Sequence, residues 1–239
     1  MANIASVSYT NQDCYSQANF LAKELNVPLG DADDMRFPRL EVSSAGLALC
    51  VQDCVPMRID FQVLVSEPLL SETTQKAILR ACGAEPGMQV VDATAGWGQD
   101  AAILAASGLN VVMLESEPVL AALLEDALQR LSDQGDASLK LALHAFDARS
   151  YLEALTPADY PDIIYMDPLH LTPHKKDFPV LKEFLVADED PLSLLEIARS
   201  RVKSRVVVKW PTRVQSLLTP TYVLEGKTVR FDAYLPSSI

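Results

Sequence analysis

No segment of this 239-residue sequence contains the roughly 18 to 20 consecutive apolar residues that a membrane-spanning helix needs. The most apolar stretch, residues 101–114, is interrupted by Ser107, Gly108 and Asn110. The N-terminal residues also lack a basic flank followed by an apolar run, which is the pattern of a secretory signal. The sequence therefore argues against membrane and secreted classes, and no membrane partner is expected.

Cysteine is scarce, with four residues at positions 14, 50, 54 and 82. Four cysteines at these spacings do not make the disulfide framework of a small secreted domain. Cys50 and Cys54 could contribute to a zinc site only with a second pair of ligands, and the sequence offers no such pair. We therefore expect a cytoplasmic protein without a metal site.

Basic residues are also few: 20 Lys and Arg against 32 Asp and Glu give a net charge of −12. An acidic balance of this size argues against nucleic acid as a partner of the whole surface. Residues 199–239 depart from it, with eight basic residues, Lys209 among them, against two acidic ones. These residues either form a local surface for RNA phosphates or are scattered solvated charges, and both interpretations stay open.

The hydrophobic share of 49% is typical of a globular fold. The pattern of residues along the sequence divides the chain into two parts. Residues 1–66 read as a small α/β extension, with strands over 4–9, 40–50 and 57–65 and a helix over 12–25. Residues 67–239 read as the main domain, and Ser71 is a candidate N-cap for its first helix, 72–82.

From residue 87 onward, strands and helices alternate strictly, which is typical of a parallel sheet covered on both faces. A pair of strands separated by a Gly-containing turn ends the chain and predicts an antiparallel hairpin. The expected strands are 88–92, 110–114, 139–145, 162–166, 205–208, 221–224 and 228–235, and the expected helices are 99–106, one that starts at Pro118, 150–155 and 191–200. The fold class is α/β, with a Rossmann-like and mostly parallel sheet.

A glycine loop follows the first strand of this sheet. Gly96 and Gly98 allow a sharp turn and a close approach of the backbone to a ligand, at the start of a helix. The loop matches the G-x-G-x-x-[GA] dinucleotide pattern, and Glu115 follows the next strand at a spacing suited to ribose hydroxyls. This pattern leaves two ligands open, a nicotinamide dinucleotide and S-adenosylmethionine (SAM).

The acidic residues at the predicted strand ends favour SAM. Asp92, Asp100, Glu115 and Asp147 lie in or just after strands, where a doubly wound sheet binds its ligand. Carboxylates repel a pyrophosphate but attract the ammonium and sulfonium groups of SAM. We expect Asp92 and Gly96 to hold the methionine part, Glu115 the ribose and Asp147 the adenine amine; a plain helix-capping role stays open for Asp100.

An Asp-Pro pair ends the fourth strand. The proline favours an extended backbone before it, which would present the Asp167 carboxylate and the Pro168 carbonyl to the cleft. Two adjacent acceptors match the two hydrogens of an exocyclic base amine, and holding that amine would orient it for methyl transfer. His170 could stack on the base or bind its edge. An ordinary turn is the alternative for Asp-Pro.

The remaining histidines and Trp210 have less specific interpretations. His170 and His174 could complete a metal triad with Asp167, but Pro173 argues against a helical pair, and we do not favour a metal. His144 lies in an apolar strand and is expected in the core, as is Trp210.

Motifs over about residues 85–239 resemble the RsmJ family, bacterial 16S rRNA (guanine-N2)-methyltransferases. They are Val-Val-Asp-Ala-Thr-Ala-Gly-x-Gly-x-Asp (90–100), Met-Leu-Glu-x-x-Pro-Val (113–119), Tyr-x-Asp-Pro (165–168), Arg-Val-Val-Val-Lys (205–209) and Arg-Phe-Asp-x-Tyr (230–234). The resemblance implies a class I SAM-dependent methyltransferase fold and a guanine of small-subunit rRNA, naked or assembled, as the target. It also implies cofactor contacts at Gln99, Asp100, Glu115, Ser116, Phe146, Asp147 and Asp167.

The chain departs from that family near the expected substrate. His170 stands where an aromatic residue is usual, and residues 61–72 lack the family's glycines and basic residues. Our hypothesis is methyl transfer from SAM to guanine N2. Two alternatives remain at this stage: an NAD-dependent oxidoreductase with the same glycine loop, and a non-catalytic relative that binds RNA or the ribosome.

Overall fold

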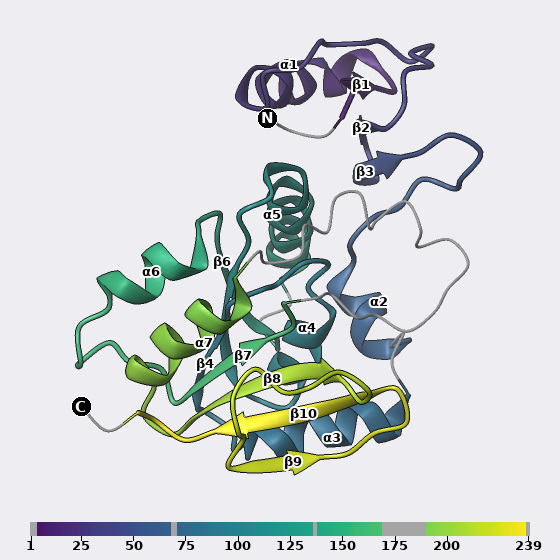
Figure 1. Cartoon of the computed structure of the whole chain (residues 1–239). Helices are drawn as coiled ribbons and strands as arrows, with labels where there is room; N and C mark the ends of the chain where they lie inside the picture. Colours follow the sequence, from purple (N-terminus) through teal and green to yellow (C-terminus); the bar gives the residue numbers. More distant parts are fainter. Residues whose placement is uncertain (1–3, 68–70, 136–137, 169–189, 238–239) are drawn as a thin grey trace.

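The computed structural model describes residues 4–67, 71–135, 138–168 and 190–237. Within these residues the chain forms a seven-stranded sheet and a separate three-stranded sheet (Figure 1). The larger sheet carries the glycine loop and the acidic strand ends, so it positions the candidate site. None of the described helices is both long enough and apolar enough to cross a membrane.

The larger sheet has the strand order β6-β5-β4-β7-β8-β10-β9. Strands β6, β5, β4, β7 and β8 run parallel to one another, whereas β10 is antiparallel to both β8 and β9. The strands are β4 (Gln89–Asp92), β5 (Asn110–Leu114), β6 (Lys140–His144), β7 (Ile163–Met166), β8 (Arg205–Pro211), β9 (Tyr222–Leu224) and β10 (Val229–Tyr234). The predicted parallel sheet and C-terminal hairpin are therefore confirmed.

In the described part of the chain, five helices flank this sheet, and local sequence sets where they begin. The Ser71 hydroxyl accepts a hydrogen bond from the Thr74 amide, as its predicted N-cap role requires, and Pro118 occupies the first turn of its helix. These helices are α3 (Glu72–Cys82), α4 (Gln99–Ala106), α5 (Pro118–Asp133), α6 (Ala148–Ala154) and α7 (Pro191–Ser200). Figure 1 shows α6 and α7 together on one side of the sheet.

Alternate strand residues enter two different hydrophobic clusters, one on each face of the sheet. In β7, Ile163 and Tyr165 join the cluster that includes α3, α4 and α5, while Ile164 and Met166 join the cluster that includes α6 and α7. A strand with both faces covered buries every side chain, which accounts for its unbroken apolar run.

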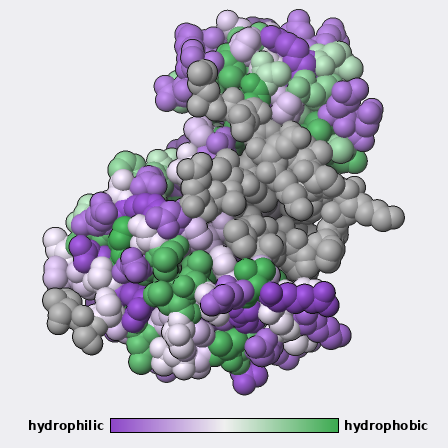
Figure 2. Space-filling view, viewed as in Figure 1, coloured by the Kyte–Doolittle hydropathy of each residue, from purple (hydrophilic) through white to green (hydrophobic). Residues whose placement is uncertain are grey.

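The N-terminal unit contains β1 (Ser6–Tyr9), a 3₁₀ turn, α1 (Tyr15–Glu24), β2 (Arg39–Ser43) and β3 (Gly46–Cys50). β2 is parallel to β1 and antiparallel to β3. On the face of the molecule shown in Figure 2, hydrophilic residues occupy much of the outer surface of this unit, at the top of the view.

The strand predicted over 57–65 is wrong. Met57 makes an isolated bridge with Leu49, but α2 (Phe61–Ser66) then follows. The Asp60 carboxylate accepts hydrogen bonds from the amides of residues 62 and 63 and so caps a helix that buries Phe61 and Leu64. Both the helical and the alternating pattern fit this short apolar run, and the aspartate cap decides between them.

The two units share one continuous hydrophobic cluster, which includes Val7 and Leu40 of the small sheet and Leu124 of α5. Arg130 of α5 also donates a hydrogen bond to the Ile59 carbonyl. The boundary between residues 66 and 67 stays a prediction.

Candidate active site

The glycine loop joins β4 to α4. Gly96 and Gly98 have φ values of +54° and +76°, in the left-handed region that favours glycine. A Cβ atom at Gly98 would lie 2.8 Å from Leu124 Cδ2 and 3.1 Å from Phe61 Cε1. Both the backbone conformation and the packing of Leu124 and Phe61 against this position therefore require glycine at position 98.

Glu115 ties the end of β5 to this loop. Its Oε2 accepts a 2.8 Å hydrogen bond from the Gly96 amide, and its Oε1 accepts a 2.7 Å bond from the Glu117 amide. Burial raises the pKa of Glu115 to about 7, although these backbone donors oppose the rise. The predicted ribose-binding carboxylate is thus fixed in place beside the loop.

Asp92 and Asp167 flank the point where the strand order reverses, since β5 and β6 follow β4 on one side and β7 and β8 lie on the other. Asp92 is 1% exposed, and burial, together with the nearby Asp100 carboxylate, raises its pKa to about 8. The Thr94 hydroxyl accepts a hydrogen bond from the Asp167 amide at 2.6 Å. The glycine loop and the Asp-Pro segment are therefore in direct contact.

The buried Lys209 bridges two aspartates, Asp100 at the start of α4 and Asp167 just after β7. Lys209 Nζ lies 2.9 Å from Asp100 Oδ2 and 3.0 Å from Asp167 Oδ2, and the Tyr165 hydroxyl donates to the same Asp100 oxygen at 2.7 Å. Burial works against the charged lysine, but both carboxylates raise its pKa. Asp100 is therefore more than a helix cap; Gly98 occupies the N-cap position of α4.

Sequence analysis does not predict this role of Lys209, which it places among the basic residues of the C-terminal region and in the Arg-Val-Val-Val-Lys motif. It is 1% exposed, so it does not present its charge to an RNA phosphate on the surface. The available signal was its position within a strand of valines that also ends in a buried tryptophan, Trp210. A lysine inside such a strand needs buried partners.

Two buried polar atoms at the start of α4 find no hydrogen-bond partner among the described residues. They are Gln99 Nε2 and Asp100 Oδ1, at the two positions that follow the glycine loop. Buried polar groups are normally paired, so unpaired ones at a loop of this type indicate a place for a ligand.

The predicted adenine contacts lie at the ends of β5 and β6. Ser116 is exposed, and Phe146 is 53% exposed, which is unusual for a large apolar side chain. Asp147 caps α6, since its Oδ1 accepts bonds from the Ser150 amide and hydroxyl, both at 2.8 Å. The structure shows this capping role, and the adenine contact stays a prediction.

Pro168 is buried next to Asp167, while His170 and His174 lie outside the described residues. His144, expected in the core, is exposed and stacks at a tilt against Tyr151, with ring centroids 5.2 Å apart. Its strand β6 is the edge of the sheet, which leaves one side open. No group of three His, Cys, Asp or Glu residues in the described part of the chain could hold a metal ion.

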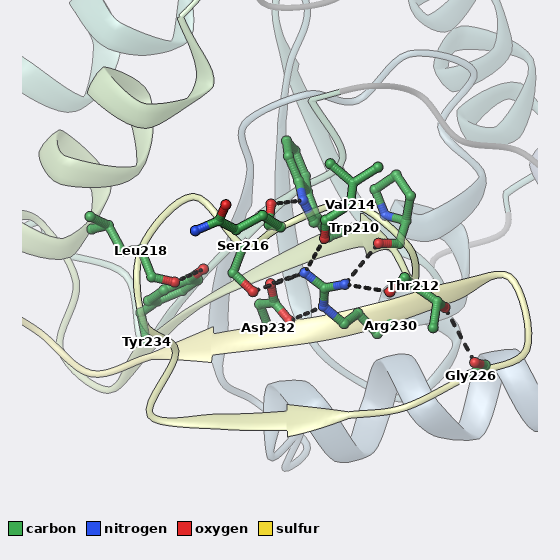
Figure 3. Close-up of polar contacts among 11 residues, drawn as sticks. Trp210, Thr212, Val214, Ser216, Leu218, Gly226, Arg230, Asp232 and Tyr234 are labelled. Atoms are coloured by element: carbon green, nitrogen blue, oxygen red, sulfur yellow. Dashed lines mark hydrogen bonds and ion pairs between the residues drawn. The ribbon is translucent and has the colours of Figure 1, made fainter.

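The loop after β8, the strand that carries Lys209, is held by a buried arginine (Figure 3). Arg230 of β10 pairs with Asp232 at 2.7 Å and donates to the carbonyls of Pro211, Thr212 and Val214 at 2.8 to 2.9 Å. The Trp210 indole donates to the Gln215 carbonyl, and the buried position predicted for this tryptophan is confirmed. These bonds fix the end of the strand that carries Lys209.

The comparisons with known proteins agree with this geometry. The family model described as "Putative SAM-dependent methyltransferase" matches residues 22–236. A protein from Legionella pneumophila (strain Lens), named ribosomal RNA small subunit methyltransferase J, is 43% identical and covers 99% of this chain and 98% of its own length. A protein of the same name from Coxiella burnetii (strain Dugway 5J108-111) is 34% identical over the full length of both chains.

A solved structure is similar over nearly the whole chain. The crystal structure of a SAM-dependent methyltransferase from Neisseria gonorrhoeae has a TM-score of 0.76 and 26% sequence identity, and covers 98% of this chain and 97% of that one. The predicted class I fold, enzyme class and SAM cofactor are therefore confirmed, and the alternative of an NAD-dependent oxidoreductase is set aside. The chain belongs to the SAM-dependent methyltransferase family whose members include ribosomal RNA small subunit methyltransferase J.

Proposed function

We propose that this enzyme transfers a methyl group from SAM to the exocyclic N2 of a guanine in small-subunit ribosomal RNA, in the cytoplasm. The observation that carries the proposal is the Asp167-Pro168 pair, which leaves β7 at the switch point of the sheet, in contact with the glycine loop through Thr94. The names of the relatives support RNA of the small subunit as the substrate.

The residues around the glycine loop fit SAM. The unpaired Gln99 Nε2 and Asp100 Oδ1 offer a donor and an acceptor, and Asp92 is a buried carboxyl group without a cation bonded to it among the described residues. A positively charged ligand would relieve the cost of ionising Asp92 in the interior. We assign the methionine part to Asp92 and Gly96.

The ribose and adenine of SAM would lie along the C-terminal ends of β5 and β6. Glu115 would bind the ribose hydroxyls with the lone pairs that its two backbone donors leave over. Ser116, Phe146 and Asp147 would surround the adenine, and the exposed Phe146 ring offers a stacking face. These three assignments depend on the family resemblance.

Bound SAM supplies an activated methyl group on a sulfonium sulfur, which keeps the bonding electron pair when the nitrogen–carbon bond forms. The Asp167 carboxylate and the Pro168 carbonyl would accept the two amine hydrogens and so aim the nitrogen lone pair. The methylated amine must lose one proton, and the Asp167 carboxylate would accept it and pass it to solvent. His170 would pack against the base.

The proposal is tested by methyl transfer in vitro. Small subunits from cells that lack the enzyme, and naked rRNA from the same cells, are incubated with methyl-labelled SAM and the wild-type chain or Asp167→Asn. We expect N2-methylguanosine as the product, with transfer by the variant reduced at least about 100-fold. Labelling of another nucleoside contradicts the assigned position, and cofactor binding without any transfer would favour a non-catalytic RNA-binding relative.

A further inference from the structure

Lys209 connects the cofactor side of the site with the substrate side. Its Nζ lies 2.9 Å from Asp100 at the start of α4 and 3.0 Å from Asp167 after β7. The lysine is 1% exposed and sits opposite Phe231 of β10 in the sheet register. The two carboxylates come from elements far apart in sequence, and this ammonium group bridges them.

Lys209, Asp100 and Asp167 form a buried cluster. The titratable groups that belong to it or lie near it come from α3, β4, α4, β7 and β8, or directly follow β7. Burial raises the pKa values of the Cys82 thiol and the Tyr165 hydroxyl, so both are neutral at pH 7. The charged or titratable groups are Cys82, Asp92, Asp100, Tyr165 and Asp167, with Arg205 near Cys82 at the other end of β8. Lys209 contacts both Asp100 and Asp167, and its positive charge offsets the repulsion between two carboxylates that share a buried site.

Stability alone does not account for a lysine at this position. A buried ion pair contributes little net stability compared with well-packed apolar side chains, and β8 otherwise places valines and a tryptophan in the interior. The lysine is also held precisely by its surroundings, since Arg230 fixes the end of its strand. Rigid support of this kind is what a group that orients another side chain requires.

We propose that Lys209 is a positioning residue for methyl transfer, which holds the Asp167 carboxylate in the orientation that receives the substrate amine. This inference rests on the proposed function, because it takes Asp167 as the group that binds the amine. Through Asp100, the same ammonium group links the position of Asp167 to the start of the cofactor-binding helix.

The test compares Lys209→Met, which removes the charge but keeps much of the length, with Lys209→Arg, which keeps the charge. At saturating SAM and pH 7, we expect kcat on undermethylated small subunits to fall about 100-fold for Lys209→Met and much less for Lys209→Arg. In a plot of kcat against pH, the acidic limb of Lys209→Met should shift to higher pH by about one unit or more, because the two carboxylates then share a proton without the ammonium charge between them. KM for the RNA should change far less than kcat.

Two further variants separate positioning from folding. Lys209→Met combined with Asp100→Asn restores the net charge of the cluster. The acidic limb of kcat against pH in this double variant should therefore return toward that of the wild type. This double variant also serves if Lys209→Met alone does not fold. Arg39→Met removes a different buried cation, paired with Glu41 in the three-stranded sheet away from the site, and should lower thermal stability without moving the acidic limb of the kcat profile.

A second readout does not depend on activity. Carboxyl ¹³C NMR follows protonation of the buried carboxylate cluster directly, and Lys209→Met should make the cluster retain a proton to higher pH than in the wild type. Unchanged kcat and an unchanged carboxyl titration in Lys209→Met would overturn the inference, as would equal losses in Lys209→Met and Lys209→Arg with no shift of the limb. If the wild type does not methylate RNA, the proposed function fails, and an unchanged carboxyl titration would then overturn the inference separately.

Discussion

Binding of SAM should release protons from two buried carboxyl groups near neutral pH. In the cofactor-free protein the pKa of Asp92 is about 8 and that of Glu115 is about 7. At pH 7 Asp92 therefore holds about 0.9 of a proton and Glu115 about 0.5. A ligand with an ammonium and a sulfonium group favours the ionised forms, so its binding removes these protons and becomes tighter as the pH rises.

The magnitude follows from the two pKa values. Between pH 6 and pH 7 the SAM association constant should rise about tenfold through Asp92 and about fivefold more through Glu115, if both ionise fully in the complex. The ammonium group of free SAM remains largely charged in this range, since α-amino groups titrate at about 7.7 to 8.0. Above the pKa of Asp92, the contribution of these two groups levels off.

Calorimetry in two buffers of different ionisation enthalpy counts the released protons. We expect about one proton or more at pH 7 with SAM, and no more than about the half proton of Glu115 with 5′-methylthioadenosine, which keeps the ribose but lacks the amino-acid part. Asp92→Asn should weaken SAM binding and leave only the rise of about fivefold between pH 6 and pH 7 that Glu115 contributes. An affinity that stays flat from pH 6 to pH 7, with no proton release, would refute the reasoning.

Three further outcomes follow from the structure. The folded state raises the pKa of Asp92 above its unfolded value, so the native chain binds more protons than the unfolded chain between about pH 4 and 8. The free energy of unfolding should therefore fall as the pH rises through that range. Asp92→Asn should reduce the fall, which urea titrations at several pH values can measure. Gly98→Ala should cost about 1–3 kcal/mol from its positive φ plus a clash, whereas Gly135→Ala, with φ +69° and no described atom within 4 Å, should show the backbone cost alone. Arg230→Met should lower the free energy of unfolding by about 3–5 kcal/mol because Asp232 stays buried without its partner, and adding Asp232→Asn should recover part of the loss in the same titration.

The sequence predicted those features of the site that short-range pattern controls. The glycine loop, the proline at the start of α5 and the acidic ends of β4 and β5 all follow from local rules of turns, helix starts and parallel strands. The candidate residues Asp92, Glu115 and Asp167 therefore came from position alone. Parallel strand ends meet at one edge of a sheet, and the structure places these residues at that edge.

The features that sequence reasoning missed depend on contacts between distant residues. Lys209 and Asp100 are 109 positions apart, and no local pattern pairs a lysine in one strand with an aspartate in a helix before the strand order is known. His144 was expected in the core because its strand is apolar, but β6 is the edge of the sheet and one of its sides is open. The pattern over residues 57–65 predicts a strand where α2 forms, because its apolar residues fit both periods.

The identity of the methylated nucleoside tests the central claim most directly. Small-subunit rRNA is isolated from cells that lack this enzyme and from the same cells supplied with the wild-type chain or with Asp167→Asn, and its nucleosides are quantified by mass spectrometry. The account predicts that one N2-methylguanosine is lost without the enzyme, returns with the wild type and does not return with the variant. An N2-methylguanosine content that is the same in all three samples would contradict it.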